Sequence, residues 1–409
     1  MKIAGIVAEY NPFHNGHAHH IERTRAPEGG GASHVAVVLS GCFVQRGEPA
    51  LLPKASRVRM ALAGGADLVL ELPVPWSLSS AEGFAFGAVS LLDALGCVDL
   101  LSFGSGCGDL ARLEAAVEAL EDPRFPKLLA YHLEGGIPFP EARQRAVAEL
   151  RSAGLASLFE EANNTLGIEY LKALRRLSSP IRPFTIPRFG AGHDAPLPAG
   201  DMASASLLRS MVQGGRLVNA AAYMPRAAAD ELAGAAAAGL APADTSRLER
   251  AVLARLRRLS AEDFARLPGV SEGLENRLAN AARKAGSLAE LLELAKTRRY
   301  PLTRLQRLVW SAFLGIPASL AGGPAQGGWN PPPYIRVLGM NERGGEILRQ
   351  AKPRLPLLTK ASQLEPLDER SRKVFALESR AADLYALALP KPYPCGAEYT
   401  TGLIRAEKH

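Results

Sequence analysis

The sequence predicts an α/β fold, in which a Rossmann-like domain with a parallel sheet is followed by a mainly α-helical C-terminal region. Two observations carry this prediction. In the first half, short apolar runs bounded by Gly, Pro, Asn or Asp alternate with stretches long enough to be crossover helices. Beyond about residue 225, apolar residues recur at helical spacing instead, as at Leu248, Val252, Leu256 and Leu259.

The elements of the first domain follow in order along the chain. We expect five buried parallel strands, at residues 2–9, 33–40, 66–72, 100–104 and 182–188. Helices are expected after the first strand and at residues 54–63, 81–95, 110–120, 140–150 and 164–177, with a last one beginning near Ser204. The boundary is placed near Pro225, which divides the chain into residues 1–225 and 226–409.

The second region begins with an Ala-rich helical stretch at residues 227–243. The turn at residues 267–270 is typical either of a helix-hairpin-helix, whose amides can contact a phosphate backbone, or of an ordinary turn between helices. A Gly/Pro-rich connector at residues 315–333 precedes a small α/β unit, expected as strand, helix and strand at 334–359. A C-terminal helix follows near residues 369–387.

Composition excludes several classes of protein. The 409 residues are 47% hydrophobic and 22% charged, which is typical of a folded chain. No apolar stretch reaches the ~18 residues of a membrane span and no secretory signal is evident, so we expect a soluble, cytoplasmic protein. The four cysteines lack a C-x-x-C pair, which argues against a zinc knuckle or a disulfide scaffold. The net charge of +7 favours a polyanionic partner.

The first strand leads into the string His14-Asn15-Gly16-His17, at the start of a helix. Free backbone amides and the helix dipole favour a phosphate there, and the i, i+3 spacing puts both imidazoles on one face. They would stabilise charge that develops on an α-phosphate and on departing pyrophosphate. The nearby His19 and His20 raise the alternative of a metal cluster, but helical geometry is expected to point them away from that face, so no metal site is predicted.

Other polar elements are candidates for the same site. A helix start at Ser204 and Ser206, with Arg209 one turn later, could hold the β- and γ-phosphates, or could be an ordinary serine cap and a surface arginine. Arg46 and Lys54 follow the second strand, at the edge where such sheets bind ligands, and are candidates for a substrate or phosphate contact.

A basic segment with interleaved aromatics lies in the C-terminal region. Such segments are typical of single-stranded RNA sites, although a solvated helix face is the alternative. The residues are Arg298, Arg299, Arg304 and Arg307, around Tyr300 and before Trp310.

With these motifs in hand, the chain resembles the bacterial tRNA(Met) cytidine acetate ligases, which belong to the HxGH nucleotidyltransferase superfamily. The resemblance spans nearly the full length. It is carried by GIVAEYNPFHNGH at residues 5–17, SGCFVQRGEPA at 40–50, DLVLELP at 67–73, FGS at 103–105, NNTLG at 163–167 and RRY at 298–300. One departure is that Gly106 and Cys107 stand where the family often has an acidic residue.

The resemblance implies that acetate is activated with ATP as acetyl-adenylate and passed to N4 of the wobble cytidine, position 34, of elongator tRNA(Met). ATP is then a substrate accompanied by Mg²⁺, and tRNA and acetate are the other partners, without a protein partner or a membrane. His14 and His17 would be catalytic. The ATP contacts it implies are Val7, Ala8, Glu9, Tyr10, Asn11, Pro12, Phe13, His14, Asn15, Gly16, His17, His20, Gly104, one of Asn163 and Asn164, and Arg188, with Ser204, Ser206 and Arg209 closing over the phosphates.

Two alternatives remain open from the residues alone. One is a nucleotidyltransferase or acid-activating ligase that acts on a small metabolite. The other is a nucleotide-dependent RNA-binding protein without catalysis. ATP turnover that depends on acetate and on tRNA would separate the three.

Overall fold

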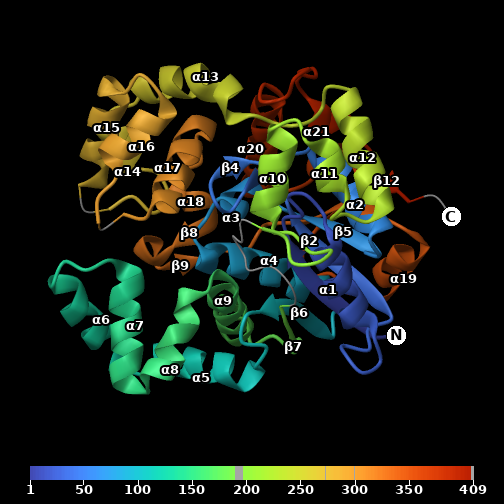
Figure 1. Ribbon diagram of the computed structural model, residues 1–409, viewed down its shortest axis with the longest axis horizontal. Coiled ribbons are helices and arrows are strands. Elements are labelled where there is room, and N and C mark those ends of the chain that lie inside the picture. Colours follow the sequence, from blue (N-terminus) through green and yellow to red (C-terminus); the bar gives the residue numbers. More distant parts are fainter. Residues whose placement is uncertain (189–196, 272, 299, 407–409) are drawn as a thin grey trace.

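A computed structural model describes residues 1–188, 197–271, 273–298 and 300–406 of the chain. Its centre is the predicted parallel sheet, whose strands all begin and end within two residues of the expected positions (Figure 1). In spatial order the strands are β5 (Leu68–Leu72), β2 (His34–Ser40), β1 (Ile3–Ala8), β6 (Leu100–Ser105) and β7 (Arg182–Pro187).

The strand order reverses at β1. The chain runs from β1 outward through β2 to β5, and then returns to place β6 and β7 on the other side of β1. Open α/β sheets bind ligands at such a point, at the carboxyl ends of the strands. The carboxyl ends of β1 and β6 therefore mark where a ligand site is expected.

The strands are buried on both faces, as their near-continuous apolar sequences predict. Along β2, Ala36 and Val38 face one apolar core while Val35, Val37 and Leu39 face a second. The first core is covered by α4 (Ala81–Leu95) and α9 (Ala162–Arg176) and extends into the C-terminal helices. The second is covered by α1 (Asn15–Arg25), α2 (Lys54–Ala63), α10 (Ala205–Gln213) and α12 (Arg226–Ala237).

Helices also project from the carboxyl side of β6. The predicted α5 (Leu110–Glu121) and α7 (Phe139–Leu150) are joined by α6 (Phe125–Glu134), which we did not predict. Phe125 is buried, and Leu128 and Leu129 pack partly buried against the same core, so α6 does have an apolar face at helical spacing that the prediction overlooked. With the short α8 (Ala153–Ala156), these helices form the lobe at the lower left of Figure 1.

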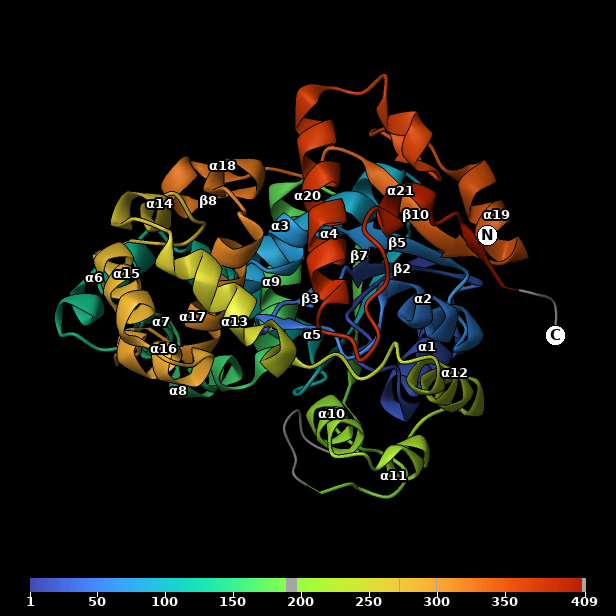
Figure 2. The same ribbon diagram turned by 90° about the horizontal axis from the view of Figure 1, so that it is seen from above.

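A second helical lobe lies above it in the same view, and is seen beside the sheet in Figure 2. It consists of α13 (Thr245–Arg257), α14 (Ala261–Ala265), α15 (Leu274–Lys284), α16 (Leu288–Ala295) and α17 (Leu302–Leu314). Leu248, Val252 and Leu256 lie on the buried face of α13, as their spacing predicts.

The expected strand, helix and strand near residues 334–359 are β10 (Ile335–Met340), α19 (Glu342–Gln350) and β11 (Leu357–Leu358). They extend the central sheet, which we did not foresee: β10 pairs antiparallel with β5, and β11 and the late β12 (Ile404–Arg405) pair with β10. The C-terminal helix, α20 (Glu369–Ala386), packs on α17 and on the short α3 (Val74–Ser77). Among the described residues, no helix is both long and apolar enough to cross a membrane.

Candidate nucleotide-binding site

A pocket of about 220 Å³ opens at the switch point of the sheet. Strand ends supply one wall, and the N-terminal halves of α1 and α9 with the first residue of α10 supply most of the rest. The lining residues are Val7, His14, Gly16, His17, His19, His20, Phe103, Gly104, Asn163, Leu166, Tyr170, Ile186, Pro187, Arg188 and Ala205.

The segment between β1 and α1 is held in place by buried contacts. Asn11 accepts a hydrogen bond from the Leu51 amide through Oδ1, at 2.7 Å. Phe13 is fully buried over Gly64, where a Cβ would approach the ring to 2.2 Å. These contacts fix His14 as the N-cap of α1, so its side chain lies at the free amides of the first turn.

The two histidines of the motif are oriented by backbone amides. Nδ1 of His14 accepts from the Gly16 amide at 3.0 Å, and Nδ1 of His17 accepts from the His14 amide at 3.2 Å. A neutral imidazole carries one proton, so an accepting Nδ1 places that proton on Nε2. Both rings line the pocket, and each therefore has an Nε2–H donor to offer a ligand.

Both rings are neutral in the protein. Burial, reinforced by Arg188 and Arg209, lowers the pKa of His14 to about 3. The pKa of His17 lies well below its usual value, again mainly because of burial and then because of the neighbouring His14. The rings stack at a centroid distance of 3.8 Å. Two adjacent imidazolium ions would repel each other, whereas two neutral donors can share one anionic ligand.

His20 belongs to the same face, which corrects the prediction that it points away. It follows His17 by three residues and lines the pocket, as does His19. Thr24 donates through Oγ1 to the His20 carbonyl at 2.8 Å, so Ser102 must donate to Thr24 at 2.7 Å and accept from Nε2 of His20 at 3.0 Å. The proton of His20 is thereby fixed on Nε2. Among the described residues, no group of three potential ligands has the arrangement of a metal site.

Most of the predicted segment at residues 7–17 shapes the site instead of lining it. Ala8, Tyr10 and Pro12 are not among the lining residues. Glu9 is half-buried, its carboxylate accepts from the Gln45 amide at 2.7 Å, and desolvation raises its pKa. Asn15 donates to the Asp201 carbonyl at 2.9 Å. Only Val7, His14, Gly16 and His17 of the segment reach the pocket.

The two asparagines of α9 differ in direction. Asn163 lines the pocket, whereas Asn164 is buried and accepts from the Cys107 amide at 3.1 Å. At Gly106, where an acidic residue is often found in the resembling family, a Cβ would lie 1.5 Å from a carboxylate oxygen of Glu161. Glu161 therefore places a carboxylate at the position that Gly106 leaves open.

The serine and arginine element lies at the pocket, but mostly behind its surface. Ser204 caps α10 by accepting from the Leu207 amide, and the next residue, Ala205, lines the pocket. Arg209 donates to the Asn11 carbonyl at 3.0 Å and pairs with Glu48 at 3.2 Å. Arg209 thus links α10 to the segment that carries the histidines. Ser206 lies 3.2 Å from Ser204 between their hydroxyl oxygens.

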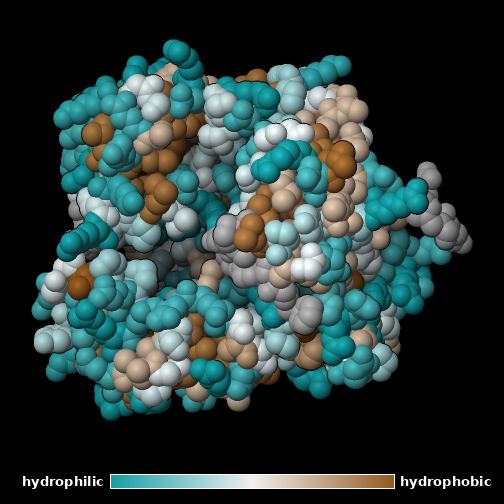
Figure 3. All heavy atoms as spheres, in the orientation of Figure 1, coloured by the Kyte–Doolittle hydropathy of each residue, from teal (hydrophilic) through white to brown (hydrophobic). Residues whose placement is uncertain are grey.

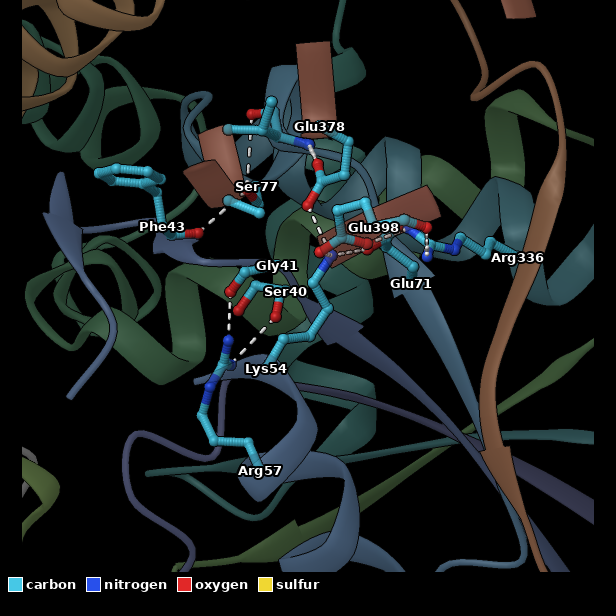
Figure 4. Close-up of polar contacts among 12 residues, drawn as sticks. Ser40, Gly41, Phe43, Lys54, Arg57, Glu71, Ser77, Arg336, Glu378 and Glu398 are labelled. Atoms are coloured by element: carbon cyan, nitrogen blue, oxygen red, sulfur yellow. Dashed lines mark hydrogen bonds and ion pairs between the residues drawn. The ribbon is translucent and has the colours of Figure 1, made fainter. Parts of the chain in front are cut away.

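Lys54 does not reach this pocket, contrary to expectation. Figure 4 shows its ammonium group among the carboxylates of Glu71, Glu378 and Glu398, with the last two at 3.0 and 2.8 Å. Arg336 joins the cluster by pairing with Glu71 at 3.2 Å and with Glu398. The charge of Lys54 is therefore neutralised inside the protein. Arg46 is also absent from the pocket lining.

The basic C-terminal residues lie elsewhere on the molecule. Arg298 is exposed, and Arg299 falls outside the described residues. Arg304 donates to the Gly269 carbonyl at 2.7 Å, and Arg307 donates to the Gln45 carbonyl at 3.2 Å. Both line a separate cavity between the two helical lobes.

Sequence reasoning missed the apolar wall of the nucleotide pocket. Phe103, Tyr170 and Ile186 line it, and Tyr170 and Phe103 are buried against each other. Their positions could have indicated this role, because Phe103 and Ile186 lie near the carboxyl ends of β6 and β7, where side chains face the ligand-binding crevice. No carboxylate is among the described lining residues, so this part of the chain does not supply the oxygen ligands that a resident Mg²⁺ would need.

Comparison with known proteins agrees with this geometry. The model of the HIGH Nucleotidyl Transferase family matches residues 1–398. A tRNA(Met) cytidine acetate ligase of Acetivibrio thermocellus is 37% identical, covering 99% of this chain and 100% of the relative. Another, of Syntrophotalea carbinolica, is 40% identical over 95% of each chain.

Two solved structures of Thermotoga maritima TmcAL are also similar. The apo form superimposes with a TM-score of 0.92 at 33% identity, and the form bound with alpha-thio ATP with 0.90 at 32%. Each comparison covers 99% of this chain and all of the other. The strand order, the paired histidines and these full-length matches agree, and the chain belongs to the tRNA(Met) cytidine acetate ligases of the HIGH nucleotidyl transferase family.

Proposed function

We propose that this protein is an ATP-dependent ligase that forms acetyl-adenylate and transfers the acetyl group to N4 of the wobble cytidine of elongator tRNA(Met). One observation carries the chemistry: two stacked, neutral imidazoles present Nε2–H groups at a helix start, in a pocket at the sheet's switch point. Such donors suit charge that develops on a triphosphate.

In the first step, a carboxylate oxygen of acetate attacks the α-phosphorus of ATP, and the bond to the bridging oxygen of pyrophosphate breaks. No side chain needs to act as a nucleophile. His14 and His17 are assigned to stabilise the negative charge on the α-phosphate and the leaving pyrophosphate. Their fixed tautomers support this role, because donors that are already oriented lose little on reaching the transition state.

In the second step, the N4 amine of cytidine attacks the acetyl carbonyl, the bond to AMP breaks, and N4 loses a proton. The base must be presented unpaired, as an anticodon-loop base is. Nucleophile, acyl group and leaving nucleotide are then all accounted for by ATP, acetate and tRNA. The protein supplies position and electrostatics.

We assign the other nucleotide contacts to residues that line or support the pocket. Gly104, Asn163 and Arg188 are candidates because they lie on its surface. Ser204, Ser206 and Arg209 are assigned to phosphate binding through the start of α10. Mg²⁺ would arrive with ATP as part of the substrate, held by its phosphates, because no described carboxylate faces the pocket.

We further propose that residues 1–225 carry the nucleotide chemistry and that residues 226–409 form a tRNA-binding region, in the cytoplasm where both substrates occur. The exposed Arg298 and its neighbour Arg299 are expected to contact the RNA backbone. Replacing Arg298 with Ala should weaken tRNA binding and reduce its dependence on salt by about one unit of slope, while adenylate formation continues.

The test combines two assays on the full chain. ATP–pyrophosphate exchange should require acetate, and mass spectrometry of tRNA nucleosides after incubation with ATP and labelled acetate should detect N4-acetylcytidine. Exchange that is supported by other small acids but not by acetate would indicate a small-metabolite ligase. Binding of ATP and tRNA without either reaction would indicate a non-catalytic RNA-binding protein.

A further inference from the structure

A second cavity lies between the two helical lobes, on the other side of α9 from the nucleotide pocket. It has a volume of about 530 Å³, which falls within the usual range for small-ligand sites. The surface is hollowed between these lobes on the left of Figure 3. Asn163, Leu166 and Tyr170 of α9 line the nucleotide pocket, while Glu169 and Lys172 line this cavity. One helix therefore separates the two sites.

A chain of hydrogen bonds also connects the cavity to the histidine-bearing segment. Gln45 donates its amide to Glu9, at the end of β1, and accepts from Arg307 at 3.2 Å. Arg307 lines the cavity. A ligand that binds Arg307 would therefore be connected through Arg307 and Gln45 to Glu9, in the segment that positions His14.

Two arginines in the cavity lack a neutralising acid. Among the described residues, neither Arg143 nor Arg307 has a carboxylate within ion-pair distance, and burial lowers the pKa of each, that of Arg307 to about 10. The nearest acid to Arg143, Glu169, is already paired with Lys172 at 2.7 Å. Partly desolvated cations without a counter-ion are costly, and an anionic ligand would offset that cost.

The rest of the lining suits the base of a nucleotide. Trp329 and Phe125 contribute aromatic surface, and Pro268 and Gly269 place the turn between α14 and α15 at the same cavity. The Nε atom of Arg143 and the Nε1 atom of Trp329 are buried donors without a partner among the described residues. The first turn of α4, which Ser80 caps, also lies at the cavity.

We propose that this cavity binds a nucleotide of the RNA substrate next to the target cytidine, with its phosphate at Arg143 and Arg307 and its base on the apolar wall. This assignment rests on the proposed function for the identity of the RNA. The two sites share α9, so an extended single strand could place the cytidine at the adenylate and its neighbour in the cavity. A cation paired with a phosphate and a flat apolar surface for stacking are the two requirements of single-strand recognition.

The test uses the full chain and an anticodon stem-loop RNA of elongator tRNA(Met). Arg143→Met keeps the aliphatic stem over Phe159, whose ring centre lies 4.3 Å from the guanidinium carbon, and removes the charge. We expect RNA affinity to fall about tenfold and the salt slope to drop by about one, while acetate-dependent exchange, which involves no RNA, keeps its rate. Arg307→Met should behave alike. The matched control is Arg145→Met on the same helix, where the arginine is exposed and paired with Glu141 at 2.6 Å.

Wild-type affinity and salt slope in Arg143→Met and Arg307→Met would overturn the proposal. A second molecule of free ATP that binds the wild type and is lost in Arg143→Met would also overturn it, in favour of a free nucleotide.

Photo-crosslinking of 4-thiouridine, placed beside the target cytidine, needs no variant. Crosslinks to α7, α17 or residues 322–329 are expected, and crosslinks confined to other segments would contradict the assignment. If the wild type acetylates nothing, yet Arg143→Met still weakens RNA binding relative to Arg145→Met, the proposed function fails and the RNA cavity stands.

Discussion

The imidazole rings of His14 and His17 lie stacked, with centroids 3.8 Å apart and planes inclined by 27°. Nδ1 of His14 accepts a hydrogen bond from the Gly16 amide, and Nδ1 of His17 accepts one from the His14 amide, so the two rings and the start of α1 form one hydrogen-bonded unit. The unit holds two donors side by side before any ligand binds. Removal of either ring should therefore slow adenylate formation more than it reduces the stability of the fold.

His17→Ala is expected to lower the rate of acetate-dependent ATP–pyrophosphate exchange by about 10²- to 10³-fold, the usual cost of one oriented donor. Thermal unfolding should change little, because His17 is a part-exposed pocket residue. The control is His132→Ala, whose ring pairs with Glu149 at 2.7 Å outside the pocket. An unchanged exchange rate would remove His17 from the mechanism.

Gly16→Ala should separate activity from stability. A Cβ at this position would lie 2.9 Å from Cε1 of His14, so the ring has to shift. Ala stabilises a helix by about 1 kcal/mol relative to Gly, and this gain offsets part of the free energy lost when the His14 ring shifts. We expect ATP affinity, measured by calorimetry, to fall roughly tenfold, which corresponds to about 1.4 kcal/mol. Gly234→Ala in α12, where the Cβ meets open space, should leave ATP affinity unchanged.

His20 should make the protein sensitive to acid. Burial lowers its pKa to about 4 in the folded state, below its usual value of 6.5. The contribution of the neutral His20 ring to the unfolding free energy is therefore fully present above about pH 6.5 and is lost as the pH falls towards 4. From pH 7 to 5, wild-type unfolding free energy should drop by about 1 to 2 kcal/mol more than that of His20→Gln in urea titrations. Asn163→Ala, which removes a non-titrating pocket residue, should keep the wild-type pH dependence.

Lys54→Met tests whether this residue is structural. Removing the ammonium leaves Glu71, Glu378 and Glu398 crowded around one remaining cation, Arg336, which should cost about 3 to 5 kcal/mol of unfolding free energy. Exchange activity per folded molecule should stay normal. The exposed Lys373→Met, which breaks a surface pair with Glu369, should cost less than about 1 kcal/mol. A stable Lys54→Met protein without exchange activity would instead indicate that Lys54 contacts the substrate.

The local parts of the fold and site could be predicted from the sequence. β1, its following segment and α1 are adjacent along the chain, and the spacing of His14 and His17 fixes their common face. The same rule, applied once more, would have placed His20 on that face, since it follows His17 by three residues. Treating His19 and His20 as a pair concealed this.

The parts that failed depend on residues far apart in sequence. Lys54 is a basic residue after a strand, but its partners come from positions 71, 378 and 398, which no local pattern connects. β10 was expected as a strand, yet its pairing with β5 depends on which sheet edge is open after folding. The cavity between the lobes was equally invisible, because Arg143, Arg307 and Trp329 meet only in three dimensions.

The insertion of β10 beside β5 has a consequence for how the protein is made. Until the ribosome has released the segment around residue 340, β5 is an unprotected sheet edge, which is prone to pair with other chains. Two of the three carboxylates that neutralise Lys54, Glu378 of α20 and Glu398, arrive later still. The residues that line the nucleotide pocket are thus all encoded in about the first half of the message, but the sheet that supports them is complete only near the end of translation.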